Sequence, residues 1–281
     1  MASQPTTRPY DWTSTRGAKW RKHLAPTEAT LAPLNEPLLQ ALQLDAPYRV
    51  ADIGCGGGDT SIEIARRAPP GSTVLGVDIS SALIEAAEQR ARSVAANGLA
   101  FQLADVAVAP PPRPAYDRLV SRFGVMFFDD PLAAFKRLHS WLAPGGRCVF
   151  AVWGPPADNP WMSMVRGAVA EVVELPAPVP DAPGPFRYAD VEAFMALLRG
   201  AGLRNLAVKQ WRGSLPVGGG LSAERAAAYS LAAHGHFHEM LTGAGPEAYA
   251  AAERALVARF RAHERAGEVW AGACVSFVSG Q

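Results

Sequence analysis

The sequence contains little cysteine and no long apolar run. Three cysteines among 281 residues are too few, and too widely spaced, for a disulfide framework or a zinc site. Apolar runs stay shorter than the roughly 20 residues that span a membrane, and the first ten residues lack the apolar region of a secretion signal. We therefore expect a cytoplasmic protein with no metal site and no membrane association.

An excess of charge of one sign is also missing. The chain carries 27 basic and 26 acidic side chains, which leaves a formal net charge of +1. Nucleic-acid-binding proteins normally carry a basic excess, so we expect a small-molecule partner and no nucleic acid. The hydrophobic fraction of 49% is ample for a core in one or two domains. We expect a monomer or a homodimer.

The chain does contain a regular alternation of apolar strands and amphipathic helices. Strands are predicted at residues 48–53, 73–79, 99–103, 118–123 and 147–153, and helices at 60–68, 82–96 and 131–142. Later segments predict a helix at 190–199, a strand at 207–211, helices at 223–241 and 247–264, and a last strand at 269–278. This alternation indicates a parallel sheet with helices on both faces, which binds ligands at the carboxyl ends of its strands.

A glycine-rich turn follows the first strand of this pattern. Within the segment from Val50 to Thr60, glycines stand at positions 54, 56, 57 and 58, where a strand turns into a helix. Residues without a Cβ adopt positive φ and let a ligand lie against the backbone. Asp59 stands where a dinucleotide-binding turn has a small residue, and the Gly-Lys-Ser/Thr of a P-loop is absent. The carboxylates of Asp59 and Asp52 disfavour a polyanionic ligand and favour a zwitterionic or cationic one.

Two further acids end the next two strands. Asp78 comes 20 residues after Gly58, a placement suited to accepting both hydroxyls of an unphosphorylated ribose. Asp105 follows the third strand, where a carboxylate could accept from an adenine amino group. The alternative is that these are ordinary loop aspartates that cap helices.

With these motifs, residues 30–155 resemble the class I S-adenosylmethionine-dependent methyltransferases of bacterial small-molecule type. The resemblance is carried by Val50 to Thr60, Val74 to Ser80, Leu103 to Val106 and Leu142 to Gly146. It implies an α/β Rossmann-like fold, with a seven-stranded, mostly parallel sheet in the order 3-2-1-4-5-7-6 and the last strand antiparallel. Helices would cover both faces, with N-terminal lid helices at 1–30, a cofactor-binding core at 31–154, and cap insertions plus the last two strands at 155–281, all in a single domain.

The resemblance also implies the cofactor, S-adenosyl-L-methionine, with S-adenosyl-L-homocysteine as its product. Asp52, Gly54 and Gly56 would surround the methionine part, Asp78 would hold the ribose, and Ile79 would pack on the adenine. The remaining implied contacts are Asp105 and Val106 at the adenine, Ser121 and Arg122 beside the methionine part, and Trp20 in the lid.

Aromatic residues gather in the segments expected to form the lid and the strand ends. The predicted acceptor pocket comprises Trp12, Phe123, Phe127, Trp153, Trp161 and Phe186. Aromatic faces stabilise a sulfonium cation, although ordinary core packing is the alternative for each ring. The apolar later part of the chain, with Trp161, Phe186, Tyr188 and Trp211, favours an aromatic or hydrophobic acceptor, such as a secondary metabolite or a quinone precursor. Oxygen is preferred over nitrogen or carbon as the accepting atom.

Methyl transfer by in-line displacement needs no obligatory base, because proximity and orientation supply about 7–11 kcal/mol. The candidates for a general base are His234 and His238, four residues apart on a predicted helix, and His23. Structural or solvated histidines, or a metal site, are the alternatives for this group. Two other functions also fit the sequence: an S-adenosylmethionine-binding enzyme that catalyses cyclisation or elimination, and a non-catalytic regulatory protein of the same fold.

Overall fold

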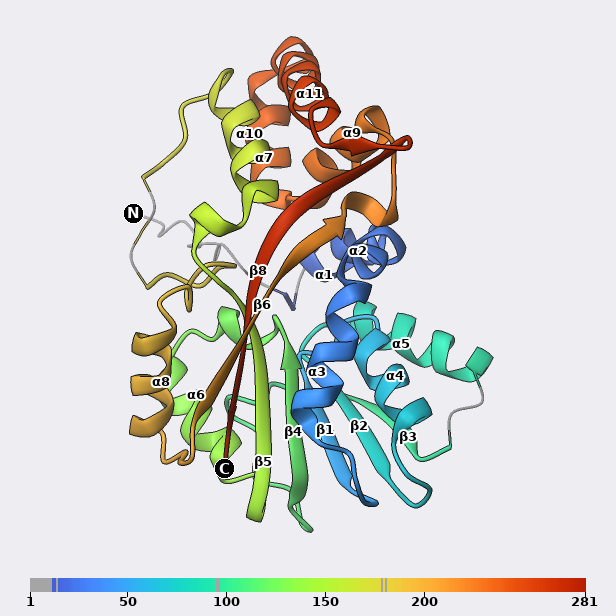
Figure 1. Cartoon of the computed structure of the whole chain (residues 1–281), viewed down its shortest axis with the longest axis vertical. Helices are drawn as coiled ribbons and strands as arrows, with labels where there is room; N and C mark the ends of the chain where they lie inside the picture. The colour runs from blue at the N-terminus through green and yellow to red at the C-terminus, as the bar shows by residue number, and fades with distance from the viewer. Residues whose placement is uncertain (1–11, 14, 95–96, 178, 180) are drawn as a thin grey trace, which may run out of the picture.

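The computed structural model describes residues 12–13, 15–94, 97–177, 179 and 181–281. Figure 1 shows a central twisted sheet with helices on both faces and a group of helices beyond the carboxyl ends of its strands. Residues 1–11 and 14 of the predicted lid lie outside the described residues. No helix in the described ranges is both long and apolar enough to cross a membrane.

The strands of the sheet run in the order β3-β2-β1-β4-β5-β8-β6, and a short β7 pairs with β8. Their bounds are β1 (Arg49–Ile53), β2 (Thr73–Asp78), β3 (Leu99–Leu103), β4 (Tyr116–Arg122), β5 (Leu142–Trp153), β6 (Ala207–Pro216), β7 (Glu264–Arg265) and β8 (Glu268–Gly280). β8 is antiparallel to both of its long neighbours, β5 and β6, whereas β1 to β5 pair in parallel. The predicted strand order is therefore confirmed, with β8 as its antiparallel member.

Eleven α-helices are found in the described ranges. They are α1 (Thr15–Arg21), α2 (Leu24–Leu31), α3 (Asn35–Leu42), α4 (Asp59–Arg67), α5 (Ser81–Val94), α6 (Pro131–His139), α7 (Pro160–Ala170), α8 (Val191–Gly200), α9 (Ala223–Ala233), α10 (Gly235–Ala244) and α11 (Pro246–Arg261). Local sequence sets several of the helix starts. α6 begins with a proline after Asp130, whose side chain accepts a hydrogen bond from Ala133 N, and Asp190 caps α8 in the same way.

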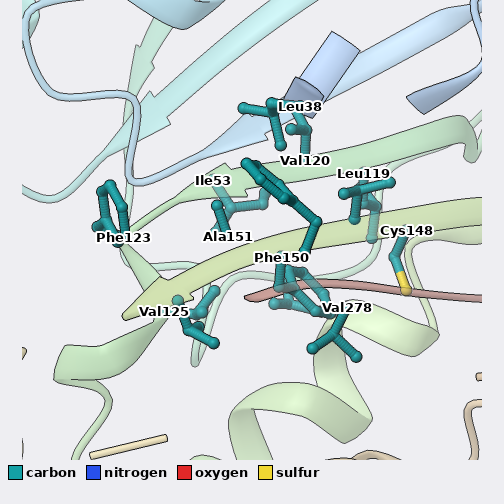
Figure 2. Close-up of a cluster of buried hydrophobic side chains, with 14 of the residues drawn as sticks. Leu38, Ile53, Leu119, Val120, Phe123, Val125, Cys148, Phe150, Ala151 and Val278 are labelled. Atoms are coloured by element: carbon teal, nitrogen blue, oxygen red, sulfur yellow. The ribbon is translucent and has the colours of Figure 1, made fainter. Parts of the chain in front are cut away.

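The main core lies where the middle of the sheet meets its covering helices. Leu119 and Val120 on β4 and Phe150 on β5 are fully buried, and Figure 2 shows them packed with Leu38 of α3 and Val278 of β8. Consecutive residues along β4 and β5 are buried because helices cover both faces of the sheet. This packing fixes the strand ends that carry the candidate site.

A second apolar cluster forms the interior of the cap. It includes Val165 of α7, Ala226 of α9, Leu256 and Phe260 of α11, and Val269 of β8. The long strands β6 and β8 extend from the sheet into this group of helices, as Figure 1 shows. The cap is therefore connected to the sheet through two continuous strands.

Three predicted helix boundaries are wrong, and one of them is the end of the last helix, which lies at Arg261 in place of residue 264. The helix expected at 223–241 is two helices, α9 and α10, because the backbone of His234 leaves the helical region (φ −84°, ψ 79°) just before Gly235. The helix expected to reach residue 142 ends at His139, and residues 142–146 belong to β5. The Pro-Gly-Gly sequence there is accommodated by a register shift between β4 and β5, opposite Tyr116 and Arg118.

Candidate functional site

The glycine-rich turn connects β1 to α4 at the carboxyl edge of the sheet. The N–H groups of Gly54 and Cys55 both donate to Val77 O, at 2.8 and 3.1 Å, which fixes the start of the turn against β2. Gly56 has a φ of +56°, and a Cβ added there would find no heavy atom of the described residues within 4 Å. The turn therefore presents the bare backbone of Gly56 on an open face.

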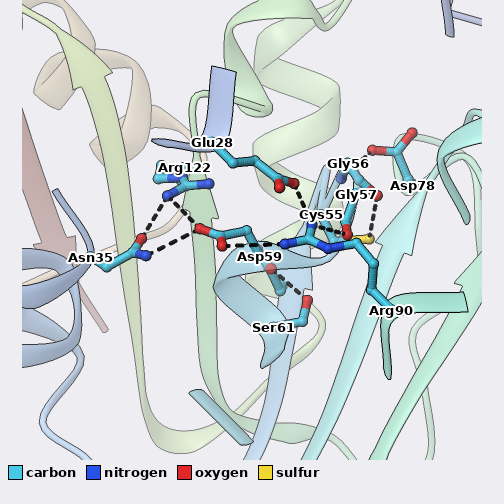
Figure 3. Close-up of polar contacts among 11 residues, drawn as sticks. Glu28, Asn35, Cys55, Gly56, Gly57, Asp59, Ser61, Asp78, Arg90 and Arg122 are labelled. Atoms are coloured by element: carbon cyan, nitrogen blue, oxygen red, sulfur yellow. Dashed lines mark hydrogen bonds and ion pairs between the residues drawn. The ribbon is translucent and has the colours of Figure 1, made fainter. Parts of the chain in front are cut away.

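Asp78 lies beside this open face, at the end of β2. Its Oδ2 accepts a hydrogen bond from Gly56 N and its Oδ1 from Ser80 N, each at 2.9 Å. Figure 3 shows the Asp78 carboxylate next to the Gly56 backbone. Burial raises the pKa of Asp78. Because a carboxylate oxygen has more than one acceptor position, both oxygens can still accept a ligand hydroxyl, and the site fits a ribose.

Asp52 lies beneath the glycine turn. Only 1% of its surface is exposed, and its Oδ2 accepts a hydrogen bond from Ser61 Oγ of α4 at 2.6 Å. Burial raises the pKa of Asp52 to about 6, against the opposing effects of the Ser61 hydrogen bond and the Arg122 charge. A cationic ligand group above the turn would favour the ionised carboxylate.

The predicted adenine-binding residues lie at the same edge of the sheet. β3 pairs in parallel with β2, which places Leu103 opposite Asp78 and brings Asp105, two residues later, to that edge. The Oδ1 of Asp105 accepts a hydrogen bond from Ala107 N at 2.9 Å. Val106 is buried, and Ile79 is half-buried. The structure therefore brings the ribose and adenine candidates together.

Ser121 and Arg122 are bonded to other protein groups. Ser121 Oγ donates to Ile53 O at 2.7 Å, and so ties β4 to β1. Arg122 Nη1 lies 3.1 Å from Asp59 Oδ2 and donates to Asn35 Oδ1 at 2.6 Å. These bonds hold the turn in place, and the position of both side chains beside the methionine part of the cofactor stays a prediction.

A network of polar side chains surrounds the glycine turn, and three of its members are not identified by the sequence prediction: Glu28, Asn35 and Arg90. Arg90 Nη1 lies 2.6 Å from Glu28 Oε1 and donates to Gly57 O at 2.7 Å, as Figure 3 shows. Burial raises the pKa of Glu28, and Arg90 opposes this rise. The one available signal is that Arg90 falls on the apolar stripe of α5, whose other members include the buried Leu83 and Ala87.

Four of the predicted pocket aromatics form a continuous row of rings. Phe123 stacks on Trp153 with centroids 4.2 Å apart and planes at 7°, and Trp153 lies 4.9 Å from Trp161. Trp161 in turn lies 6.3 Å from Phe186. Phe123 has a φ of +65°, which is strained for a bulky residue and is held by this packing. The row extends from the end of β4 to the cap.

The remaining predicted aromatics form a separate group, in which the lid meets the segment after β4. The Trp12 ring lies 5.7 Å from that of Trp20 and 5.4 Å from that of Phe127. α1 packs directly on the turn after Asp78, because a Cβ at Gly17 would come within 1.9 Å of Ser80 Oγ. Trp20 is therefore carried by a helix that covers the ribose candidate.

The three candidate histidines have different surroundings. The His234 ring lies 5.9 Å from that of Trp161, and its Nδ1 is 2.6 Å from Ser230 O. His238 Nδ1 lies 3.2 Å from the hydroxyl of Tyr249. The His23 ring lies 6.1 Å from that of Tyr229, where α2 meets the cap.

These surroundings set His234 apart from the other two candidates. Burial lowers the pKa of His234, which favours the neutral ring. Burial and the neighbouring His238 also lower the pKa of His23. His234 lies against the row of rings, whereas His23 and His238 contact tyrosines. Because the predicted helix breaks at His234, this residue and His238 do not share one helix face.

Comparison with known families and proteins shows that the part of the chain that carries the glycine turn is similar to methyltransferases. The methyltransferase domain family matches residues 50–146. A demethylmenaquinone methyltransferase of Thermus thermophilus is 33% identical over 156 residues, which are 54% of this chain and 69% of the relative. A trans-aconitate 2-methyltransferase of Methylobacterium radiotolerans is 32% identical over 199 residues, covering 59% of this chain and 73% of the relative.

The fold has a counterpart among solved structures. The YcgJ protein of Bacillus subtilis superposes with a TM-score of 0.55 over 89% of this chain and 97% of its own. At 16% sequence identity, this likeness concerns the fold alone.

Proposed function

Because the chain belongs to the class I S-adenosylmethionine-dependent methyltransferases, we propose that it methylates a small aromatic or hydrophobic acceptor, at oxygen. The observation that carries the choice of acceptor is the row of rings formed by Phe123, Trp153, Trp161 and Phe186. Phe123 and Trp153 are buried and form the base of this row, whereas the half-buried rings of Trp161 and Phe186 would offer flat apolar faces to a planar molecule. Of the two relatives, the one named for demethylmenaquinone supports an aromatic acceptor better than the one named for trans-aconitate.

We assign the parts of this function to the three predicted regions of the single domain. Residues 1–30 cover the cofactor, residues 31–154 bind it, and residues 155–281 supply the cap over the acceptor. The contacts that support this division include the close packing of Gly17 on Ser80, and an ion pair of 2.8 Å between Lys19 of α1 and Glu239 of α10.

In the cofactor half, the open face of Gly56 and the carboxylate of Asp78 are proposed to hold the nucleoside. When bound, S-adenosylmethionine supplies the methyl group and the positive sulfonium that makes it transferable. Asp52 is proposed to favour the positively charged end through the field of its buried carboxylate. Asp105 is proposed to accept from the adenine amino group. The residues thus bind and orient, which is the main requirement of an in-line displacement.

In the acceptor half, His234 is proposed to take the proton of an acceptor hydroxyl. A backbone carbonyl only accepts hydrogen bonds, so the contact with Ser230 O places the proton of neutral His234 on Nδ1. Nε2 then carries a free lone pair. The hydroxyl proton would pass to Nε2 as the acceptor oxygen takes the methyl group that bound S-adenosylmethionine would supply, with S-adenosylhomocysteine as the leaving group. The lowered pKa of His234 keeps the ring in the accepting form near neutral pH.

The test is methyl transfer from isotope-labelled S-adenosylmethionine to a panel of naphthols, quinols, phenols and aliphatic carboxylic acids. Mass spectrometry should detect a methyl ether and S-adenosylhomocysteine in equal amounts, with naphthols or quinols preferred. Cofactor binding without S-adenosylhomocysteine formation, against every acceptor, would support a non-methylating role instead. Methylation of the carboxylic acids alone would overturn the proposed acceptor class.

A further inference from the structure

The lid helix α2 rests directly on the glycine turn. A Cβ added to Gly57 would come within 2.8 Å of Glu28 Oε1 and 2.9 Å of both Leu24 methyl carbons. Gly57 therefore faces the lid, whereas Gly56, one residue earlier, faces the open side. A shift of α2 would therefore change the contacts that Leu24 and Glu28 make with this turn.

Arg90 connects the lid to the turn through one guanidinium group. Its Nη1 pairs with Glu28 Oε1 at 2.6 Å and donates to the Gly57 carbonyl at 2.7 Å, and its Nη2 lies 3.6 Å from Asp59 Oδ1. Glu28 has only 12% of its side chain exposed. An isolated surface ion pair contributes little, but here the same cation also satisfies a backbone carbonyl of the turn.

The network continues beyond Arg90 to the opposite side of the turn. Asp59 Oδ2 lies 3.1 Å from Arg122 Nη1 and accepts from Asn35 Nδ2 at 3.1 Å. Side chains from α2, α3, α4, α5 and β4 thus meet around the turn, as Figure 3 shows. The geometry that presents Gly56 N to Asp78 is supported from both sides.

We propose that Arg90 is a positioning residue for the cofactor, which holds the Gly57 carbonyl and couples the placement of α2 to the shape of the cofactor-binding turn. The proposal rests on the proposed location of S-adenosylmethionine at Gly56 and Asp78. Arg90 acts through the turn and through Glu28, without a contact of its own to the ligand. Loss of its donor would let the turn and the lid move independently, and the binding face would no longer be preorganised.

The first test is isothermal titration calorimetry with S-adenosylhomocysteine. Arg90→Ala should weaken binding about tenfold, because a charged donor to the turn is lost. Arg92→Ala is the matched control, since Arg92 is an exposed arginine on the same helix, and it should bind as the wild type does. Wild-type affinity in Arg90→Ala would overturn the proposal. A wild-type protein that does not bind S-adenosylhomocysteine would instead refute the proposed function beneath it.

Two further variants separate positioning from a general loss of stability. Arg90→Lys keeps a cation that can donate to the Gly57 carbonyl, so most of the affinity should be retained. The double variant Glu28→Arg with Arg90→Glu restores an ion pair but sets a carboxylate against that carbonyl. Its melting temperature should recover towards the wild type while binding stays about tenfold weak. Recovery of affinity in parallel with melting temperature would show that the pair matters only for stability, and would overturn the proposal.

Discussion

The sheet half (residues 31–154), which is the proposed cofactor half, and the cap half (residues 155–281), which is the proposed acceptor half, position their functional groups by different means. In the sheet half, backbone hydrogen bonds at 2.9 Å from Gly56 and Ser80 fix the Asp78 carboxylate. In the cap half, the rings of Trp161 and Phe186 continue a row that begins at Phe123 and Trp153 of the sheet half, with neighbouring centroids 4.2 to 6.3 Å apart. Backbone bonds specify one geometry, whereas ring packing tolerates a change of shape. Substitutions in the first half should therefore alter cofactor affinity, and those in the second should alter acceptor use.

The largest expected effect lies in the cap half. His234→Ala should lower kcat for a hydroxyl acceptor by about 10²–10⁴-fold, because the proton acceptor is removed. S-adenosylhomocysteine affinity should stay unchanged, which calorimetry can check beside steady-state kinetics. In the wild type, the lowered pKa of His234 means that the rise of kcat with pH should have its midpoint below the ordinary histidine value of 6.5. An unchanged kcat in the variant would remove His234 from the reaction.

The next effect lies in the sheet half. Asp78→Ala should weaken S-adenosylhomocysteine binding by about 100-fold, because two ribose hydroxyls lose a charged acceptor. Asp78→Asn keeps the shape of the side chain and should fall between the variant and the wild type. Calorimetry on both variants makes the comparison. A loss of less than threefold in Asp78→Ala would mean that the ribose binds elsewhere.

A smaller effect, on the KM for the acceptor, is expected for a substitution in the row of rings. Trp161→Leu removes the ring between Trp153 and Phe186 and should raise KM for the acceptor about tenfold, with the loss of a stacking face. Trp141→Leu is a control of the same chemistry, since Trp141 is a core residue packed against Tyr116. That control should lower thermal stability without a selective change in KM. A Trp161 variant with weakened cofactor binding and normal KM would break the proposed division.

The last and smallest effect is a change in the pH dependence of stability, which depends on the buried carboxylate of Asp52. The folded-state pKa of Asp52, about 6, lies above its ordinary value of 3.8, so the native state binds the proton more tightly than the unfolded state. This contribution to stability is present below about pH 4 and is lost as the pH rises to 6. Asp52→Asn should therefore raise stability at pH 7 by about 1–3 kcal/mol, and should flatten the decline between pH 4 and 6. Thermal unfolding across this range is the measurement, and a destabilised variant at pH 7 would contradict it.

The parts of the fold that were predictable are those with short-range causes. Alternating strands and helices predicted a parallel sheet, and the glycines before Asp59 marked the turn, because these patterns follow from local backbone chemistry. The order of the strands came from the resemblance to the methyltransferase family. The same reasoning brought Asp78 and Asp105 to one edge, since the ends of parallel strands must meet there. The helix at 223–241 was predicted wrongly, because helical spacing outweighed the break that Gly235 allows after His234.

The parts that were not predictable depend on contacts between distant segments. Glu28 and Arg90 are 62 positions apart, and Asn35 and Arg122 are 87 apart. Nothing in the local sequence of either pair indicates its partner. The proposed acceptor pocket shares this difficulty: the types of ring are visible in the sequence, but the row that they form depends on how the cap folds back over β5.

The most direct test of the account is a crystal structure of the protein with S-adenosylhomocysteine. We expect both ribose hydroxyls on the Asp78 carboxylate, the adenine near Asp105, and the sulfur facing the Phe123 and Trp153 end of the row of rings. A ribose bound away from Asp78, or a sulfur facing away from these rings, would contradict the proposed division between the cofactor half and the acceptor half.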